Sequence, residues 1–234
     1  LNITINNDYY SRRNHNRQSI IESSIIGGES VFGSNNRITS SMFASKGTAE
    51  YSFKVNTLEL GYEVTATSRK YVFLNDGDYL PDANDKIKET TGAGFVAVNL
   101  PIRNVELYAG LRYEHTSSDY YQNGLYVKGQ SRKYGRLFPN VDFTFPIGKA
   151  KFTLSYEAKT KRPLYSQLSS SIQYDDCFTY ETGNPLLTSE QIHNVSLAGI
   201  YKWVFFSATY TYDKDAIISV IRPYKPDAPQ NIMT

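Results

Sequence analysis

The residue types that could do chemistry are spread thinly along this chain of 234 residues. The three histidines are His15, His115 and His193, and no two of them stand at a spacing that would place both imidazoles on one metal ion. Cys177 is the single cysteine, which excludes an intrachain disulfide and a Cys-x-x-Cys site. The sequence also contains neither Gly-x-Ser-x-Gly nor a P-loop. We therefore expect no catalysis, no metal site and no cofactor.

Charged side chains within alternating segments are the next candidates. In the stretch VELYAGLRYEH, from Val105 to His115, every second residue is apolar, and Glu106, Arg112 and Glu114 belong to the other set. This alternation predicts a β-strand with one apolar face and one polar face. On a hydrated face, such groups are structural charges rather than acid–base catalysts.

The same alternation recurs along the chain, at 43–55, 58–66, 142–145, 150–159 and 204–213. Several of these runs last about ten residues, the length that crosses a bilayer when the strand is tilted. Nearly every charge within them lies on one face. If that face lines the interior of a barrel, the lumen-facing charges are Glu106, Arg112, Glu114, Lys151 and Glu157.

Composition restricts the class of protein further. Mean hydropathy is −0.45, and no apolar run approaches the roughly 18 residues of a membrane-spanning helix. A net charge of +2 gives no strong attraction to nucleic acid, and we expect none to bind. The 20 tyrosines suit a membrane–water interface, but they also suit a carbohydrate-binding surface.

The connections between the predicted strands alternate in length. Short turns are predicted at Asn14–Asn16, Asn56–Thr57, Pro101–Asn104, Pro146–Lys149 and Tyr201–Trp203. Longer polar connections are predicted at 27–37, 67–91, 115–133, 160–192 and after 213. Short turns on one side and long loops on the other are typical of outer-membrane barrels. The sequence thus predicts an all-β, antiparallel transmembrane barrel contributing about ten strands, two of them before residue 28.

Two other readings stay open at this point. A soluble, extracellular, tyrosine-rich β-sandwich that binds glycans would show the same face alternation. A small passive porin would show the same loop asymmetry. Dependence on detergent separates the first from a membrane barrel, and conductance without an energy-supplying partner identifies the second.

The stretch LSYEAKTKRPLYSQLSSSIQYDDCFTYETGNPLLTSEQIHNVSLAGIY, from Leu154 to Tyr201, resembles outer-membrane β-barrels of the TonB-dependent receptor type. The upstream segments AGLRYEHT and LFPNVDFTF are similar to barrel strands of the same family, in the same order. The residues that carry the resemblance are Arg162, Pro163, Tyr165 and Leu168, then Tyr174, Asp175, Phe178 and Tyr180, then Gly183, Asn184, Pro185, Leu187 and Glu190.

The resemblance implies a barrel of about 22 strands with a plugged lumen, of which residues 1–234 are one part. It implies a bacterial outer-membrane location, contact with lipid, and inward transport of a nutrient. The energy would come from a TonB-type complex acting through a plug domain. We expect neither that plug nor a signal peptide within this chain, which starts at Leu1.

Ligand selection is expected from the loop Leu164–Gln191. The candidate ligand-binding residues are Tyr174, Asp175, Tyr180 and Glu181. Aromatic rings bury area at little entropic cost, and nearby carboxylates can orient a polar ligand. Gly183 is expected to adopt a positive φ in the Gly-Asn-Pro turn that returns the chain to the next strand.

Overall fold

The computed structural model describes residues 1–24, 28–77, 79–226 and 229–234, and most of them belong to β-strands. The strands are β1 (Asn2–Ser24), β2 (Gly28–Phe53), β3 (Asn56–Asp76), β4 (Ala83–Ile102), β5 (Val105–Gln122), β6 (Leu125–Tyr126), β7 (Arg132–Ile147), β8 (Ala150–Lys161), β9 (Ile172–Asp176), β10 (Thr179–Thr182), β11 (Glu190–Tyr201), β12 (Val204–Lys214), β13 (Ile221–Pro223) and β14 (Asn231–Met233). A 3-10 turn, η1, spans Lys128–Gln130. None of the described residues forms a helix that is long and apolar enough to cross a membrane.

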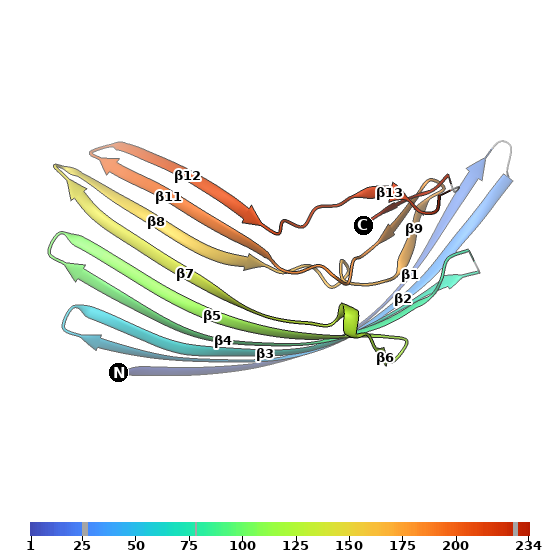
Figure 1. The fold of residues 1–234 in the computed structure, drawn as a ribbon, viewed down its shortest axis with the longest axis horizontal. Helices are drawn as coiled ribbons and strands as arrows, with labels where there is room; N and C mark the ends of the chain where they lie inside the picture. Colours follow the sequence, from blue (N-terminus) through green and yellow to red (C-terminus); the bar gives the residue numbers. More distant parts are fainter. Residues whose placement is uncertain (25–27, 78, 227–228) are drawn as a thin grey trace.

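Ten strands form one curved antiparallel sheet, in the order β1-β2-β3-β4-β5-β7-β8-β11-β12 with β6 paired to β5 (Figure 1). The remaining four form a small sheet in the order β13-β14-β10-β9, in which β10 and β14 run parallel. Figure 1 shows the large sheet bent into a trough, with the β9 hairpin and β13 in its hollow. The predicted antiparallel all-β architecture is confirmed.

Residues 162–189, here called the inner segment, leave the large sheet between β8 and β11 and return to it. The sheet closes behind them, because Lys161 at the end of β8 pairs with Glu190 at the start of β11. The inner segment packs against the concave face of β4 and β5, where Leu168 joins the buried Ile87 and Tyr120. The core of the molecule therefore lies in the hollow of the sheet.

Four short turns of two residues each join successive strands, at 54–55, 103–104, 148–149 and 202–203, and the last three are confirmed where they were predicted. The first residue of each has a positive φ, as a tight connection between antiparallel strands requires. The turn predicted at Asn56–Thr57 lies two residues earlier than expected.

The turn predicted at Asn14–Asn16 is wrong. Strand β1 continues through it, and Asn14 and Asn16 pair with Ile38 and Asn36 of β2. One strand, not two, precedes residue 28, and the connection at 25–27 lies outside the described residues. Asn, Arg and Ser residues lie on both faces of this strand, and a run of such polar residues is also typical of a turn.

Much of the predicted connections at 27–37, 67–91 and 115–133 is also strand. Residues 28–37 belong to β2, and β3, β4 and β5 extend to Asp76, Ala83 and Gln122. At about 3.3 Å per residue, a strand of 26 residues such as β2 is far longer than the roughly 30 Å hydrocarbon layer. Outside that layer neither face needs apolar residues, so the alternation stops while the hydrogen-bonded ladder continues.

Candidate functional site

The two faces of the large sheet differ in chemistry along continuous cross-strand rows. One row on the convex face joins Leu107, Phe143, Leu154, Leu197 and Ala208 through direct pairing of five strands. Several of these side chains are exposed: Leu154 retains 45% of its accessible surface. On β5 this apolar run spans Val105–Tyr113 and gives way to His115, a length that matches one tilted crossing of a bilayer.

The concave face carries the charges. Rows of paired residues place Gly110, Asn140, Glu157, Asn194 and Thr211 on it, three positions along each strand from the apolar row. By the same register, all five charged residues that were expected to face a lumen lie on the side that the inner segment covers: Glu106, Arg112, Glu114, Lys151 and Glu157.

An ion-pair network fixes the start of the inner segment to this face. Arg112 donates to Glu63 and to Glu114, in both cases at 3.1 Å. Arg162 donates to the other oxygen of Glu114 at 2.6 Å. Glu114 is 6% exposed, so its carboxylate is desolvated and depends on these two guanidinium groups. Pro163, which has no N–H to donate, follows directly and prevents β8 from continuing.

A buried carboxylate fixes the middle of the inner segment. Asp85 on β4 is 2% exposed. Its oxygens accept hydrogen bonds from Ser169 Oγ at 3.0 Å, from Ser170 N at 2.8 Å and from Ser170 Oγ at 2.9 Å. Ser170 Oγ also accepts from Gln122 Nε2 at 3.0 Å. This network was not foreseen, because Asp85 and Ser170 are 85 positions apart in the sequence.

The Gly-Asn-Pro turn fixes the end of the inner segment, although not in the expected way. Gly183 is absent from the glycines with positive φ, so that expectation is wrong. A Cβ at Gly183 would instead stand 2.6 Å from the carbonyl oxygens of Ser166, Gln167 and Ser169. Asn184 N donates to Gln167 O at 2.6 Å. The two halves of the motif that carries the resemblance therefore pack directly on each other.

The candidate ligand-binding residues lie on the β9–β10 hairpin, but not as one cluster. Tyr174 stacks on Phe32 of β2 with ring centroids 3.9 Å apart, and it contacts Tyr180 at 5.9 Å. Burial raises the pKa of Tyr174 above its ordinary value, so its hydroxyl stays protonated. Asp175 is exposed. Glu181 pairs with Gln173, in the cross-strand pair next to the pair that Tyr174 and Tyr180 form.

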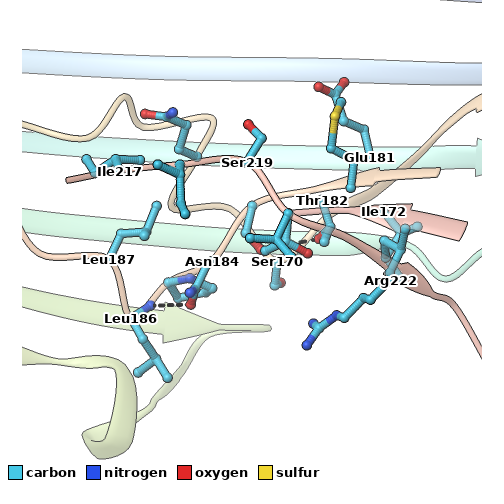
Figure 2. Close-up of a pocket in the computed structure, with 18 residues that line it drawn as sticks. Ser170, Ile172, Glu181, Thr182, Asn184, Leu186, Leu187, Ile217, Ser219 and Arg222 are labelled. Atoms are coloured by element: carbon cyan, nitrogen blue, oxygen red, sulfur yellow. Dashed lines mark hydrogen bonds between the residues drawn. The ribbon is translucent and has the colours of Figure 1, made fainter. Parts of the chain in front are cut away.

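Glu181 faces a pocket of about 790 Å³ (Figure 2). Its walls come from residues 167–172, 181–187, 217–222 and 232–234, and the side chains drawn in Figure 2 come from these segments. Ile172, Leu187 and Ile217 supply apolar surface, while Arg222 and Glu181 supply charges of opposite sign. A mostly apolar pocket with a few polar groups can bind a small molecule.

The histidines and the cysteine are widely separated in the fold. Among the residues that the structure describes, no three His, Cys, Asp or Glu side chains gather as ligands. His15, His115 and His193 lie on β1, β5 and β11, and Cys177 is exposed at the tip of the β9–β10 hairpin.

A family model described as the outer membrane protein beta-barrel family matches residues 1–234. The chain belongs to this family. It is therefore an outer-membrane β-barrel protein, and the sandwich reading is set aside. No curated protein matches the chain.

Solved structures share the fold of the large sheet. The copper transporter OprC matches with a TM-score of 0.65 at 11% identity, over 98% of this chain and 39% of its own. The ferric yersiniabactin uptake receptor FyuA of Yersinia pestis matches with a TM-score of 0.56 at 11% identity, over 92% and 34%. The Serratia marcescens hemophore receptor HasR, solved with its hemophore HasA and heme, matches with a TM-score of 0.56 at 11% identity, over 98% and 44%. This chain spans less than half the length of each, and identities this low establish the fold alone.

Proposed function

We propose that this chain is part of an outer-membrane receptor that takes up a nutrient, as in TonB-dependent receptors. The large sheet forms a section of the barrel wall, with its convex apolar face in lipid and its concave charged face toward the lumen. The chain binds and passes its ligand without making or breaking covalent bonds. Energy comes from a TonB-type complex acting through a plug domain outside these residues.

The observation that carries the proposal is the inner segment. It is fixed at Glu114, at Asp85 and at Gly183, so it occupies the hollow of the sheet in a defined position. It presents the Tyr174–Tyr180 aromatic pair and the pocket beside Glu181. A passive channel needs open space in its lumen, whereas a receptor needs side chains held there to select a ligand.

The functions named for the similar structures support the same class. They describe a siderophore uptake receptor, a copper transporter and a hemophore receptor, all of them proteins that capture or move a ligand. Each shares the fold of the chain at 11% sequence identity. The ligand of this protein is therefore sought among nutrients in general rather than copied from any one of them.

The test is nutrient uptake by cells that make the whole protein, with and without the TonB-type complex. Replacing Tyr174 and Tyr180 together by Ala should reduce uptake at least tenfold, since both rings leave the hairpin. The matched pair of Phe substitutions keeps the Phe32 stack and should retain most of the uptake. Heat-modifiable gel mobility reports assembly of each variant. Uptake that persists without the energy complex would contradict the proposal and favour a passive porin.

A further inference from the structure

A second cavity, of about 290 Å³, lies on the concave face of β1, β2 and β3, away from the pocket beside Glu181. The side chains that define its chemistry are Tyr10, Arg12, Ile38, Met42, Arg69 and Tyr165. Five of them come from the sheet and one, Tyr165, comes from the inner segment.

Strand register brings the two arginines together. Arg12 pairs with Ser40, and Ser40 pairs with Arg69, so one cross-strand row carries both guanidinium groups with a small hydroxyl residue between them. Tyr10, two positions before Arg12 on the same strand, faces the same side.

These two cations have no counter-charge among the described residues. Elsewhere in the described part of the chain, Arg112, Arg136 and Arg162 each form an ion pair with a carboxylate. Arg12 and Arg69 form no ion pair with any described residue. No carboxylate lines the cavity. Two convergent guanidinium groups in a recess favour an anion, and their planar N–H groups suit a carboxylate.

The remaining walls favour a ligand with a ring. The Arg69 guanidinium lies 5.2 Å from the centroid of the Tyr165 ring, which holds it over the cavity. Ile38 and Met42 supply apolar surface, and Tyr10 retains 46% exposure, which leaves its ring free to stack.

We propose that this cavity is a binding subsite for an aromatic carboxylate group of the transported solute. The inference rests on the proposed function, because it names the chemistry of the nutrient that the receptor takes up. Arg12 and Arg69 bind the carboxylate, and Tyr10 and Tyr165 flank the ring.

The test measures binding of benzoate and of its neutral analogue benzamide to the whole protein in detergent micelles, by ligand-observed NMR. The parent protein should bind benzoate at least tenfold more tightly than benzamide. The Arg12→Gln/Arg69→Gln variant should lose at least fivefold of that preference. The matched Arg13→Gln/Arg37→Gln variant removes the same charge from the opposite face of β1 and β2 and should retain it. If the Arg12→Gln/Arg69→Gln variant does not assemble, the single change Arg12→Gln is used instead, because Arg12 is exposed. This change should still lower the affinity for benzoate about threefold.

An absence of preference in the parent protein would overturn the inference. Retention of the preference after Arg12→Gln/Arg69→Gln would overturn it as well. The proposed function is judged separately. A benzoate preference that depends on these arginines, in a protein that takes up no nutrient, would support the subsite and refute the receptor. Energy-dependent uptake, together with benzoate binding that is unchanged by the arginine substitutions, would support the receptor and refute the subsite.

Discussion

Arg162 and Glu114 are 48 positions apart, and their side chains meet at 2.6 Å on the concave face of the sheet. The contact ties the first residue of the inner segment to the middle of β5. Because Glu114 also accepts from Arg112, one buried carboxylate compensates two guanidinium groups.

Removing this carboxylate should loosen the inner segment. Glu114→Ala leaves Arg112 and Arg162 without their shared partner, and we expect a loss of about 2 kcal/mol, below the range for fully buried pairs because Arg162 is partly exposed. Chemical denaturation of the whole protein in micelles measures the loss. Lys159→Ala, at an exposed ion pair with Glu157, is the control and should change stability by less than about 0.5 kcal/mol. Equal effects of the two changes would refute a special role for Glu114.

Gly183→Ala should disturb the inner segment through contact alone. The added Cβ meets three backbone carbonyl oxygens at 2.6 Å, and relief of this overlap should cost about 2 kcal/mol or more. Limited proteolysis across residues 163–189 should become faster. Gly129→Ala, where no atom lies within 4 Å of the new Cβ, should leave cleavage unchanged. Normal protection of Gly183→Ala would mean that the packing of Gly183 against residues 166–169 is not needed.

Asp85→Asn should release the middle of the inner segment. The amide has one acceptor oxygen in place of the two that bind Ser169 and Ser170, so buried donors lose partners at about 1–3 kcal/mol. Hydrogen exchange at the backbone N–H of Ser170 should accelerate at least tenfold. Asp175→Asn, at an exposed position of the hairpin, should leave that rate unchanged.

Leu154→Arg should destabilise the protein in a bilayer by about 2–4 kcal/mol if the row through Leu154 lies near the midplane. The neighbouring Ser155→Arg places the same side chain on the concave face and should cost much less. Spin labels at the two positions give an independent readout, since a lipid-soluble quencher should reach position 154 far better than 155. Equal quenching at both would disprove the assignment of faces.

Alkaline pH should weaken the packing of the inner segment through Tyr120. Burial raises the pKa of Tyr120 above its ordinary value of 10.0, so the unfolded chain releases this proton at a lower pH than the folded chain does. The contribution of Tyr120 is therefore complete below pH 10 and declines as the pH rises above it. Denaturation at pH 8 and at pH 11 measures the free energy of unfolding at each pH. The decrease in this free energy from pH 8 to pH 11 should be smaller in Tyr120→Phe than in the parent protein. Tyr126→Phe, at a side chain that is 53% exposed, should lose as much as the parent.

Within the membrane the fold was readable from the sequence, because lipid and water impose opposite demands on alternate residues. The pair Leu154 and Ser155 illustrates this, with the first on the convex face and the second on the concave face. Beyond Tyr113 that contrast disappears and polar residues occupy both faces. Strand and loop then look alike, which is why the ends of β2 to β5 were misjudged. Asn123-Gly124 was a usable signal there: both residues have positive φ and form the two-residue turn between β5 and β6.

The candidate site was only partly readable. Tyr174, Tyr180 and Glu181 lie in one hairpin, and local sequence was sufficient to group them. What holds that hairpin in place was not readable, because Asp85 meets Ser170 across 85 positions and nothing local marks either residue as a partner. Gly183 shows a further limit: the sequence indicated that glycine matters there, but the reason is contact with residues 166–169 rather than backbone torsion.

The way that the sheet closes behind the inner segment has a consequence for the order of folding. Apart from the β8–β11 pair, successive strands along the path of the large sheet are neighbours or near neighbours in sequence, so their contacts form early and cheaply. Pairing of Lys161 with Glu190 must instead close a loop of the whole inner segment, and the parallel pairing of β10 with β14 spans a still longer stretch. The wall can therefore assemble before its contents dock. We therefore expect the hairpin that carries Tyr174 and Tyr180 to become native last and to open before the large sheet does.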